Sequence, residues 1–163
     1  MIQFENIKLG YGSRTLIANL SAKICAGELT ALVGRNGTGK STLLRAIAGL
    51  GDIVDGKIII DGKDITSLTA PEMATRVAFV TTDKVRITNL RCRDVVALGR
   101  APYTNWIGRM QQSDTRIVEE SLASVGMSEY ADKTMDKVSD GECQRIMIAR
   151  ALAQQTPIIL LDE

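Results

Sequence analysis

Apolar and polar residues alternate along the first part of the chain, and this two-residue period predicts β-strands. The apolar positions fall into two series, over residues 2–9 and 16–20, with Gly10 and Gly12 between them. Strict alternation is typical of a strand that buries one face, and the glycines between the series favour a turn. The sequence therefore predicts two antiparallel strands at its beginning.

Between residues 28 and 80 the apolar pattern predicts three further strands and one helix. Three short apolar runs predict further strands: residues 28–33, 57–60 and 76–80. Residues 43–49 have apolar positions at helical spacing and end in a glycine, which predicts a helix. The run 57–60 leads directly into Asp61-Gly62, a strong signal for a two-residue hairpin turn.

From about residue 83 to residue 155 the spacing of apolar residues is helical. Three helices are expected, over residues 93–99, 115–125 and 141–154. Gly99 and Gly126 indicate helix ends, and Ser113-Asp114 indicates an N-terminal cap. A last apolar run, residues 157–161, predicts a buried strand that ends in two carboxylates.

Composition narrows the function mainly by exclusion. The 163 residues are 45% hydrophobic and 24% charged with a net charge of +1, which suits one soluble domain with its own core. No dense basic stripe supports nucleic-acid binding, and no segment resembles a signal peptide or a membrane span. The sequence has no histidine, which excludes histidine catalysis, and its three cysteines are far apart, which favours reduced thiols in the cytosol.

A glycine-rich segment joins the predicted strand 28–33 to the helix that follows it. It matches the pattern G-x-x-x-x-G-K-[ST] in the strand–loop–helix context that the pattern requires. Its residues are Gly34, Arg35, Asn36, Gly37, Thr38, Gly39, Lys40, Ser41 and Thr42. The glycines let backbone N–H groups converge on phosphate oxygens, Lys40 offers a charge to the β- and γ-phosphates, and Ser41 offers a ligand to Mg²⁺. The segment predicts that the chain binds a nucleoside triphosphate.

Asp162 and Glu163, at the end of the last predicted strand, supply the other half of such a site. Ligands of open α/β sheets lie at the carboxyl ends of the strands, so Asp162 is expected to face the Mg²⁺ bound by Ser41. Glu163 is expected to polarise the water that attacks the γ-phosphorus. Lys40 and Glu163 are therefore the predicted catalytic residues.

The segment 138–145, Val-Ser-Asp-Gly-Glu-Cys-Gln-Arg, resembles the signature motif L-S-G-G-Q-x-Q-R of ATP-binding cassette (ABC) ATPases. As in that family, a helix and then the strand with the two carboxylates follow it. The resemblance covers the whole chain and implies an α/β fold with a P-loop NTPase core and an N-terminal antiparallel part, residues 1–82 and 156–163. It implies an inserted helical subdomain over residues 83–155, and strands missing after the second carboxylate.

The resemblance also implies roles for three residues outside the phosphate loop. In the family, the serine and second glycine of the signature, here Ser139 and Gly141, cap the γ-phosphate of ATP held by another subunit. Two chains thereby enclose two nucleotides as a homodimer. An aromatic residue after the first strand, here Tyr11, stacks on adenine in the family.

Three positions depart from the family pattern. Thr82 stands where a glutamine usually senses the γ-phosphate, and Asp140 and Glu142 replace a glycine and a glutamine of the signature. A carboxylate at a helix N-terminus stabilises the helix but competes with phosphate for the same partial charge. Because the missing strands would leave apolar surface uncovered, the 163-residue polypeptide is expected to turn over ATP poorly alone.

The resemblance implies the cytoplasmic ATPase subunit of a membrane transporter, held peripherally on the inner face of the plasma membrane by permease subunits. Residues 95–103 and 106–109 look like segments of importers for iron–siderophore, haem or cobalamin. The helical subdomain would dock on the permease. Tyr103 and Trp106 are candidate contacts there or, equally, part of that subdomain's core.

Three other functions remain open at this point. One is a non-transport ABC ATPase that acts on nucleic acid or ribosomes, although the accessory modules of such proteins are absent. Another is a GTPase or small-molecule kinase, although no guanine-reading Asn-Lys-x-Asp segment occurs. The third is a binding fragment without catalytic activity.

Overall fold

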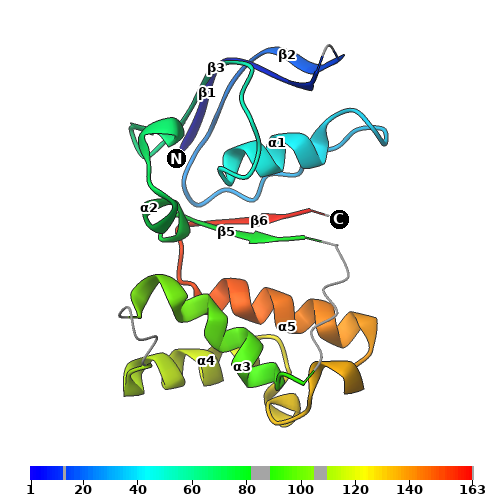
Figure 1. Cartoon of the computed structure of the whole chain (residues 1–163), viewed down its shortest axis with the longest axis vertical. Coiled ribbons are helices and arrows are strands. Elements are labelled where there is room, and N and C mark those ends of the chain that lie inside the picture. The colour runs from blue at the N-terminus through cyan, green and yellow to red at the C-terminus, as the bar shows by residue number, and fades with distance from the viewer. Residues whose placement is uncertain (13, 82–88, 105–109, 163) are drawn as a thin grey trace. The chain divides into compact units, whose positions relative to one another are not determined.

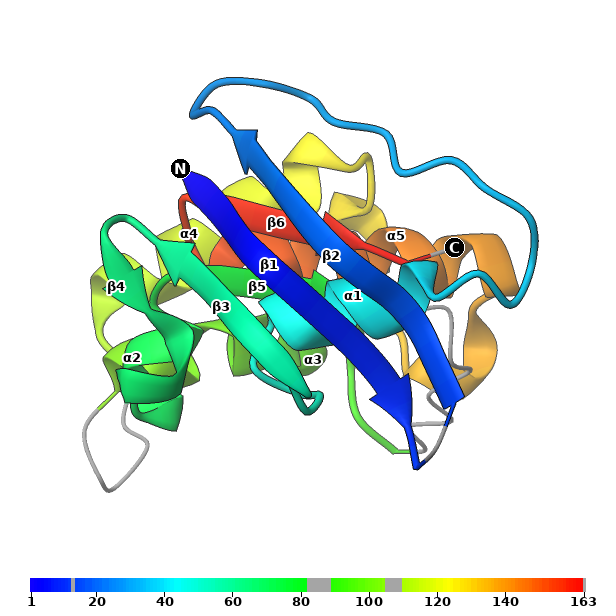
Figure 2. The ribbon, with the colours of Figure 1, turned by 90° about the horizontal axis from the view of Figure 1, so that it is seen from above.

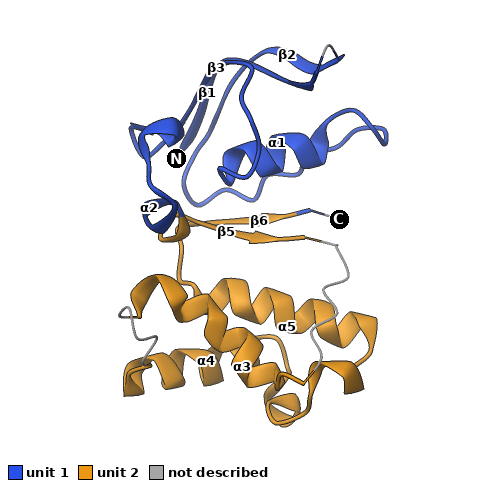
Figure 3. Cartoon of the chain, in the orientation of Figure 1, with its two compact units in different colours: residues 1–73, 162 blue, residues 74–161, 163 orange. Residues whose placement is uncertain are grey.

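The structure is a computed structural model that describes residues 1–12, 14–81, 89–104 and 110–162. The chain divides into two compact units, residues 1–73 together with Asp162, and residues 74–161 (Figure 3). The functional division predicted from the sequence, with a boundary near residue 82, stays a prediction.

An antiparallel sheet forms the first unit's framework, and its strands lie side by side in Figure 2. In the order β2-β1-β3-β4, the strands are β1 (Ile2–Tyr11), β2 (Arg14–Ile24), β3 (Asp55–Ile60) and β4 (Lys63–Asp64). The apolar series of β1 skips from Phe4 to Ile7, and an irregularity at Asn6, whose φ is 48°, returns the later residues to the buried face. The predicted antiparallel pair is confirmed.

The hairpin between β3 and β4 is confirmed as well. Asp61 and Gly62 connect the two strands, and both have positive φ angles, 49° and 79°. A two-residue connection with two left-handed residues matches the twist of the flanking strands, which is why Asp-Gly is favoured there.

The helix after the glycine-rich loop is α1 (Lys40–Ile47). Leu43, Ala46 and Ile47 are its buried side chains, and Gly49 follows it with a φ of 70°, as the sequence predicts. A 3₁₀ turn (Ile65–Ser67) and the short helix α2 (Ala70–Ala74) lie beyond β4.

The strand predicted at residues 28–33 is wrong for this structure. These residues have no regular secondary structure, and Leu29 and Val33 expose 100% and 89% of their surface. A strand needs a hydrogen-bonding neighbour, and no strand in the described ranges pairs with this run. An apolar run alone therefore does not make a strand.

A parallel pair of strands and three helices form the second unit (Figure 1). The strands are β5 (Val77–Val80) and β6 (Ile158–Leu161), paired in register from Val77 with Ile158 to Val80 with Leu161. The helices are α3 (Cys92–Ala97), α4 (Gln112–Ser124) and α5 (Asp140–Ala153), with 3₁₀ turns at Leu98–Tyr103, Ser128–Tyr130 and Met135–Lys137. Their shared core contains Cys92, Val95, Val96, Val118, Leu122, Ile146 and Ala149.

Two predicted helix boundaries in this unit are wrong. Gly99 does not end a helix but lies in the 3₁₀ turn Leu98–Tyr103, where a Cβ would collide with the carbonyl oxygen of Arg150. The N-terminal cap of α4 is Gln111 rather than Ser113-Asp114, and the Asp114 carboxylate accepts from the Gln111 backbone N–H at 2.9 Å. Gly126, with a φ of 68°, follows the end of α4 as predicted.

The C-terminal end of α5 is fixed to β5. Gln154 Nε2 donates to the carbonyl oxygens of Ala74 at 2.6 Å and Val77 at 3.1 Å. Arg150 donates to the Phe79 carbonyl at 3.4 Å, and burial lowers the pKa of its guanidinium. These bonds hold the helix against the strand that pairs with β6.

Candidate nucleotide-binding site

The phosphate-loop residues 34–42 form a glycine-dependent turn into α1. Gly37 and Gly39 have φ angles of 80° and 99°, which side-chain-bearing residues rarely adopt. A Cβ on Gly39 would lie only 3.2 Å from Leu16 Cβ of β2, so the missing side chain also permits close packing. No side chain caps the N-terminus of α1, which leaves its first N–H groups to an anion.

Lys40 lies folded into this loop. Its Nζ donates to the carbonyl oxygens of Gly34 at 2.9 Å and Arg35 at 3.0 Å, and Thr38 Oγ1 donates to the same Arg35 oxygen at 2.9 Å. An ammonium group carries three donors, so one remains for a phosphate oxygen while two hold the lysine in place. The predicted phosphate-binding lysine therefore lies beside the uncapped helix N-terminus.

Ser41 and Asp162 are brought together from positions 121 residues apart. The Ser41 hydroxyl donates to Asp162 Oδ1 at 2.8 Å, and both residues belong to the first compact unit. Hydroxyl and carboxylate oxygens are hard donors, and Mg²⁺ is usually held by one or two carboxylates together with substrate phosphates and water. Within the described ranges, no group of three or more acidic, cysteine or histidine side chains could hold a metal ion by itself. The Ser41–Asp162 pair thus fits a magnesium ion whose other ligands are nucleotide phosphates and water.

Ser139 is the N-terminal cap of α5, and its polar groups already have a partner. The Ser139 backbone N–H and Oγ donate to Glu142 Oε2 at 2.7 and 2.8 Å, and the Glu142 N–H donates back to Oγ at 3.4 Å. These bonds form a capping box, in which the glutamate neutralises the helix N-terminus. Gly141 is exposed, with open space where a Cβ would lie.

The Glu142 carboxylate is held in its ionised form. Its pKa is lowered to about 2, chiefly by the Ser139 backbone N–H and then by the hydroxyls of Tyr130 and Ser139. The ammonium of Lys133 lies 3.9 Å from the centre of the Tyr130 ring and lowers the same pKa further. The signature helix therefore carries an internal anion at its N-terminus.

We expect Glu142→Gln to reduce the loss of stability in acid. The folded-state pKa, about 2, lies below the ordinary value of 4.5. The ionised carboxylate therefore stabilises the folded state above about pH 4.5, and this contribution disappears as the pH falls toward about 2. Urea unfolding across that range should show the difference between wild type and Glu142→Gln narrowing with acid, and a difference that stays constant would contradict this assignment.

The remaining predicted site residues are placed less completely. Tyr11 ends β1 opposite Arg14 and is 65% exposed, which leaves its ring free to stack on a base. Thr82, Trp106 and Glu163 lie outside the described residues. Lys40, Ser41 and Asp162 are thus assembled in the first unit, whereas Ser139 and Gly141 belong to the second.

Comparison with known protein families decides the assignment. The family model described as ABC transporter matches residues 17–163. This chain belongs to the ABC transporter ATP-binding family. The match spans the phosphate loop, the signature segment and the carboxylates, so the resemblance based on those motifs is confirmed.

Several relatives support this ABC assignment. An uncharacterised ABC transporter ATP-binding protein of Methanocaldococcus jannaschii is 40% identical over the whole chain and 56% of its own length. The iron(3+)-hydroxamate import ATP-binding protein FhuC of Bacillus subtilis is 35% identical over 98% of the chain and 59% of its own length. The chain thus spans somewhat more than half the length of these relatives.

The fold agrees with that of a solved ABC protein. A dimeric ATP-binding cassette in a post-hydrolysis state, bound to ADP and Pi, superposes with a TM-score of 0.85 at 27% identity, over all of this chain and 74% of the other. The predicted α/β ABC fold with its antiparallel N-terminal part is confirmed. No helix in the described ranges is both long and apolar enough to cross a bilayer.

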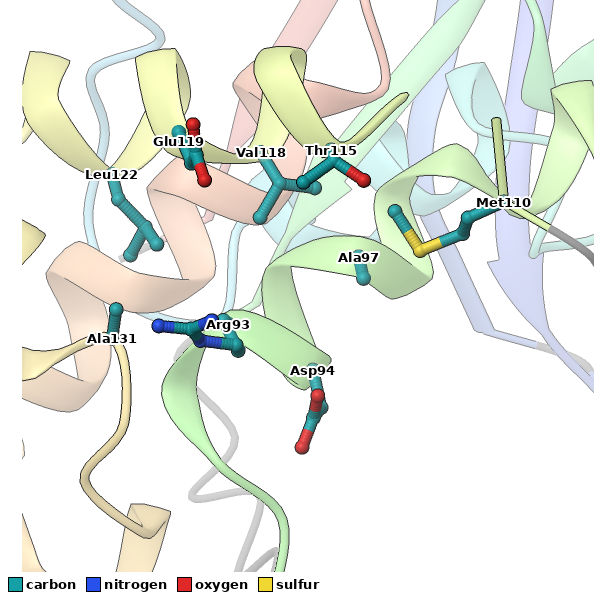
Figure 4. A pocket seen from close by; sticks show the side chains of 9 residues that line it. All are labelled: Arg93, Asp94, Ala97, Met110, Thr115, Val118, Glu119, Leu122 and Ala131. Atoms are coloured by element: carbon teal, nitrogen blue, oxygen red, sulfur yellow. The ribbon is translucent and has the colours of Figure 1, made fainter. Parts of the chain in front are cut away.

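The helical part of this ABC domain contains a groove that the sequence analysis missed (Figure 4). Its volume is about 170 Å³, and it lies between α3 and α4. Ala97 of α3 and Val118 and Leu122 of α4 give it apolar walls, while Asp94 and Glu119 bring carboxylates to it. Helical spacing predicted the apolar residues but not the gap between the two helices.

Arg100 and Asp114 are a second feature of this ABC domain that the sequence did not reveal. Only 6% and 4% of their surfaces are exposed, and Arg100 Nε donates to Asp114 Oδ1 at 2.9 Å. The Gln111 N–H and, less strongly, the bonded arginine lower the pKa of the Asp114 carboxyl. No local pattern in the sequence predicted this pair, because Arg100 and Asp114 lie 14 residues apart in different elements.

Proposed function

We propose that the chain is part of the ATP-binding and ATP-hydrolysing subunit of an ABC importer of the iron–siderophore, haem or cobalamin type. The observation that carries the proposal is the Ser41–Asp162 contact of 2.8 Å beside the loop that holds Lys40. Relatives named for iron(3+)-hydroxamate, ferric enterobactin and cobalamin import support the solute class. The subunit acts on the cytoplasmic face of the membrane.

The residues of the first unit divide the work of holding ATP. Backbone N–H groups from Gly37 to Ser41 surround the β- and γ-phosphates, and Lys40 neutralises their charge. Ser41 and Asp162 would hold Mg²⁺, which would draw charge from the γ-phosphate. Tyr11 supports the adenine ring through its exposed face.

Glu163 and the signature segment complete the reaction. Glu163 follows Asp162 directly and orients the attacking water as a general base. Ser139 and Gly141 meet the γ-phosphate held by a second copy of the subunit, in a homodimer. The Glu142 carboxylate, bonded to Ser139 in the isolated chain, must release that hydroxyl when the phosphate arrives.

The permease docks on the groove between α3 and α4. Its apolar walls accept a nonpolar side chain, and burial of that side chain excludes water from the contact. Arg93 at the groove is paired with Asp132 at 2.8 Å, and Asp94 and Glu119 bring two carboxylates to the groove. The docking segment therefore combines an apolar residue with a basic one.

Replacement of Asp162 by asparagine in the full-length protein tests the magnesium assignment. An amide lacks the negative charge that favours Mg²⁺, so Mg²⁺ should no longer strengthen ATP binding, and ATPase activity should fall about 10²-fold or more. ATP binding by isothermal titration, with Mg²⁺ and with EDTA, measures this. Asp52→Asn, an exposed position in the same unit, is the control. An Asp162→Asn protein that keeps full Mg²⁺ dependence would contradict the proposal.

A further inference from the structure

Arg100 and Asp114 are the only charged residues counted as buried within the described ranges. Both residues lie in the second unit, whereas the phosphate loop belongs to the first. Hydrophobic residues of similar volume usually stabilise a core at least as well as a buried ion pair does. The pair therefore calls for an explanation other than stability.

The Arg100 guanidinium bonds to residues at the beginning of α4 and at the end of α5. Nε donates to Asp114 Oδ1 at 2.9 Å, while Nη1 donates to the Ala153 carbonyl at 2.8 Å and to Gln155 Oε1 at 3.1 Å. Its charged carbon lies 4.2 Å from the centre of the Tyr103 ring. The planar, forked geometry of arginine allows these bonds to be made together.

Asp114 connects the beginning of α4 to the Arg100 guanidinium. Its second oxygen, Oδ2, accepts from the Gln111 N–H at 2.9 Å and caps the helix. One carboxylate thus serves α4 on one side and Arg100 on the other. Because α4 provides one wall of the groove, the position of that wall depends on the ion pair.

Ala153 and Gln155 connect the Arg100 guanidinium to the end of α5. Ala153 is the last residue of that helix, and its carbonyl is one of those left without an intrahelical partner. Gln154, between them, is bonded to β5. The strand β6 begins at Ile158, four residues after Gln154, and Asp162 follows its last residue.

We propose that Arg100 is a positioning residue that makes α4, α5 and β6 move as one body, so that permease docking at the groove reaches the ATP site. This inference rests on the proposed function. Coupling between distant sites requires an element that both sites bias, and a rigid unit held by a buried charged contact meets this requirement. Without the Arg100 contacts to Asp114, Ala153 and Gln155 (the Arg100 clamp), α4 shifts at the groove while α5 stays in place.

Two substitutions in the full-length protein, assembled with its permease, test this role. Arg100→Lys keeps a charge for Asp114 but lacks the fork that also reaches Ala153 and Gln155. Gln155→Asn tolerates the positive φ of 51° at that position, and its shorter side chain withdraws from Arg100. The second variant loses a single hydrogen bond and keeps the test valid even if the first folds poorly.

The measured quantity is the ratio of permease-stimulated to basal ATPase activity. We expect Arg100→Lys to lower this ratio about tenfold and Gln155→Asn about threefold, with basal kcat and KM for ATP within about twofold of wild type. Arg116→Lys, in an exposed pair with Glu120 on the same helix, should leave both activities unchanged. Thermal melting of each variant establishes that it is folded.

Each other outcome overturns the inference. Equal losses of basal and stimulated activity would assign Arg100 a purely structural role, and an unchanged ratio in both variants would remove the role altogether. If the wild-type ATPase is not stimulated by the permease, the proposed function itself fails, and this inference fails with it. The wild-type measurement thereby separates the two failures.

Discussion

Lys40→Ala in the full-length protein is expected to reduce ATP turnover by about 10²–10³-fold, the usual effect of removing one group that stabilises transition-state charge. The lysine ammonium lies within the loop, bonded to the Gly34 and Arg35 carbonyls, and no other cation in that loop is bonded to its backbone within the described residues. Alanine leaves the backbone N–H groups in place, so the remaining activity should reflect the helix N-terminus alone.

Steady-state ATPase assays with Mg²⁺ and ATP measure this effect. Lys63→Ala, an exposed lysine at the β3–β4 hairpin of the same unit, provides the control and should keep wild-type activity. Turnover by Lys40→Ala at the rate of the control would show that the loop is not the catalytic phosphate site. Loss of activity in both variants would indicate an effect of charge in general.

Arg100→Ala should lower the free energy of unfolding by about 3–5 kcal/mol, the range found when one partner of a buried ion pair is removed. The substitution leaves the Asp114 carboxylate, the Ala153 carbonyl and the Gln155 amide without the guanidinium that joins them. The buried Asp114 carboxylate and Ala153 carbonyl are costly to leave unsatisfied, whereas the exposed Gln155 amide can bond to water instead. Urea unfolding, followed by the helical signal, measures the change.

The matched control is Arg116→Ala. Arg116 also pairs with a carboxylate, Glu120, at 2.7 Å, but this pair is exposed to solvent on α4. Exposed pairs of this kind contribute little to stability. Similar unfolding curves for Arg100→Ala and Arg116→Ala would mean that burial of the Arg100–Asp114 pair has no energetic consequence.

The sequence predicted the fold best where structure depends on local pattern. Alternation of apolar residues identified β1 and β2, and Asp61-Gly62 identified the hairpin between β3 and β4, because both signals act within a few residues. The failure at residues 28–33 has a different origin. Whether an apolar run becomes a strand depends on a neighbour elsewhere in the chain, which periodicity does not reveal.

The same distinction applies to the site. The phosphate loop could be predicted because one continuous segment supplies the glycines and Lys40. The Ser41–Asp162 contact needed only the rule that ligands lie at the ends of strands. The Ser139–Glu142 capping box was visible as a serine followed three residues later by a glutamate, yet Glu142 was interpreted only as added charge.

The Arg100 clamp was beyond any local rule. Its partners lie 14, 53 and 55 residues away along the chain, and its burial follows from how α4 and α5 pack. An arginine in a short 3₁₀ turn is ordinarily exposed. Only the assembled fold distinguishes Arg100 from an exposed arginine such as Arg116.

Gly99 and Arg100 act together in holding their segment against α5. Gly99 lets the chain approach the Arg150 carbonyl, and the next residue reaches the carbonyl of Ala153, one turn further along α5. Any side chain at position 99 would push this segment away from the helix and draw the guanidinium off its acceptors. Natural variation should therefore replace positions 99, 100 and 114 together or leave all three unchanged.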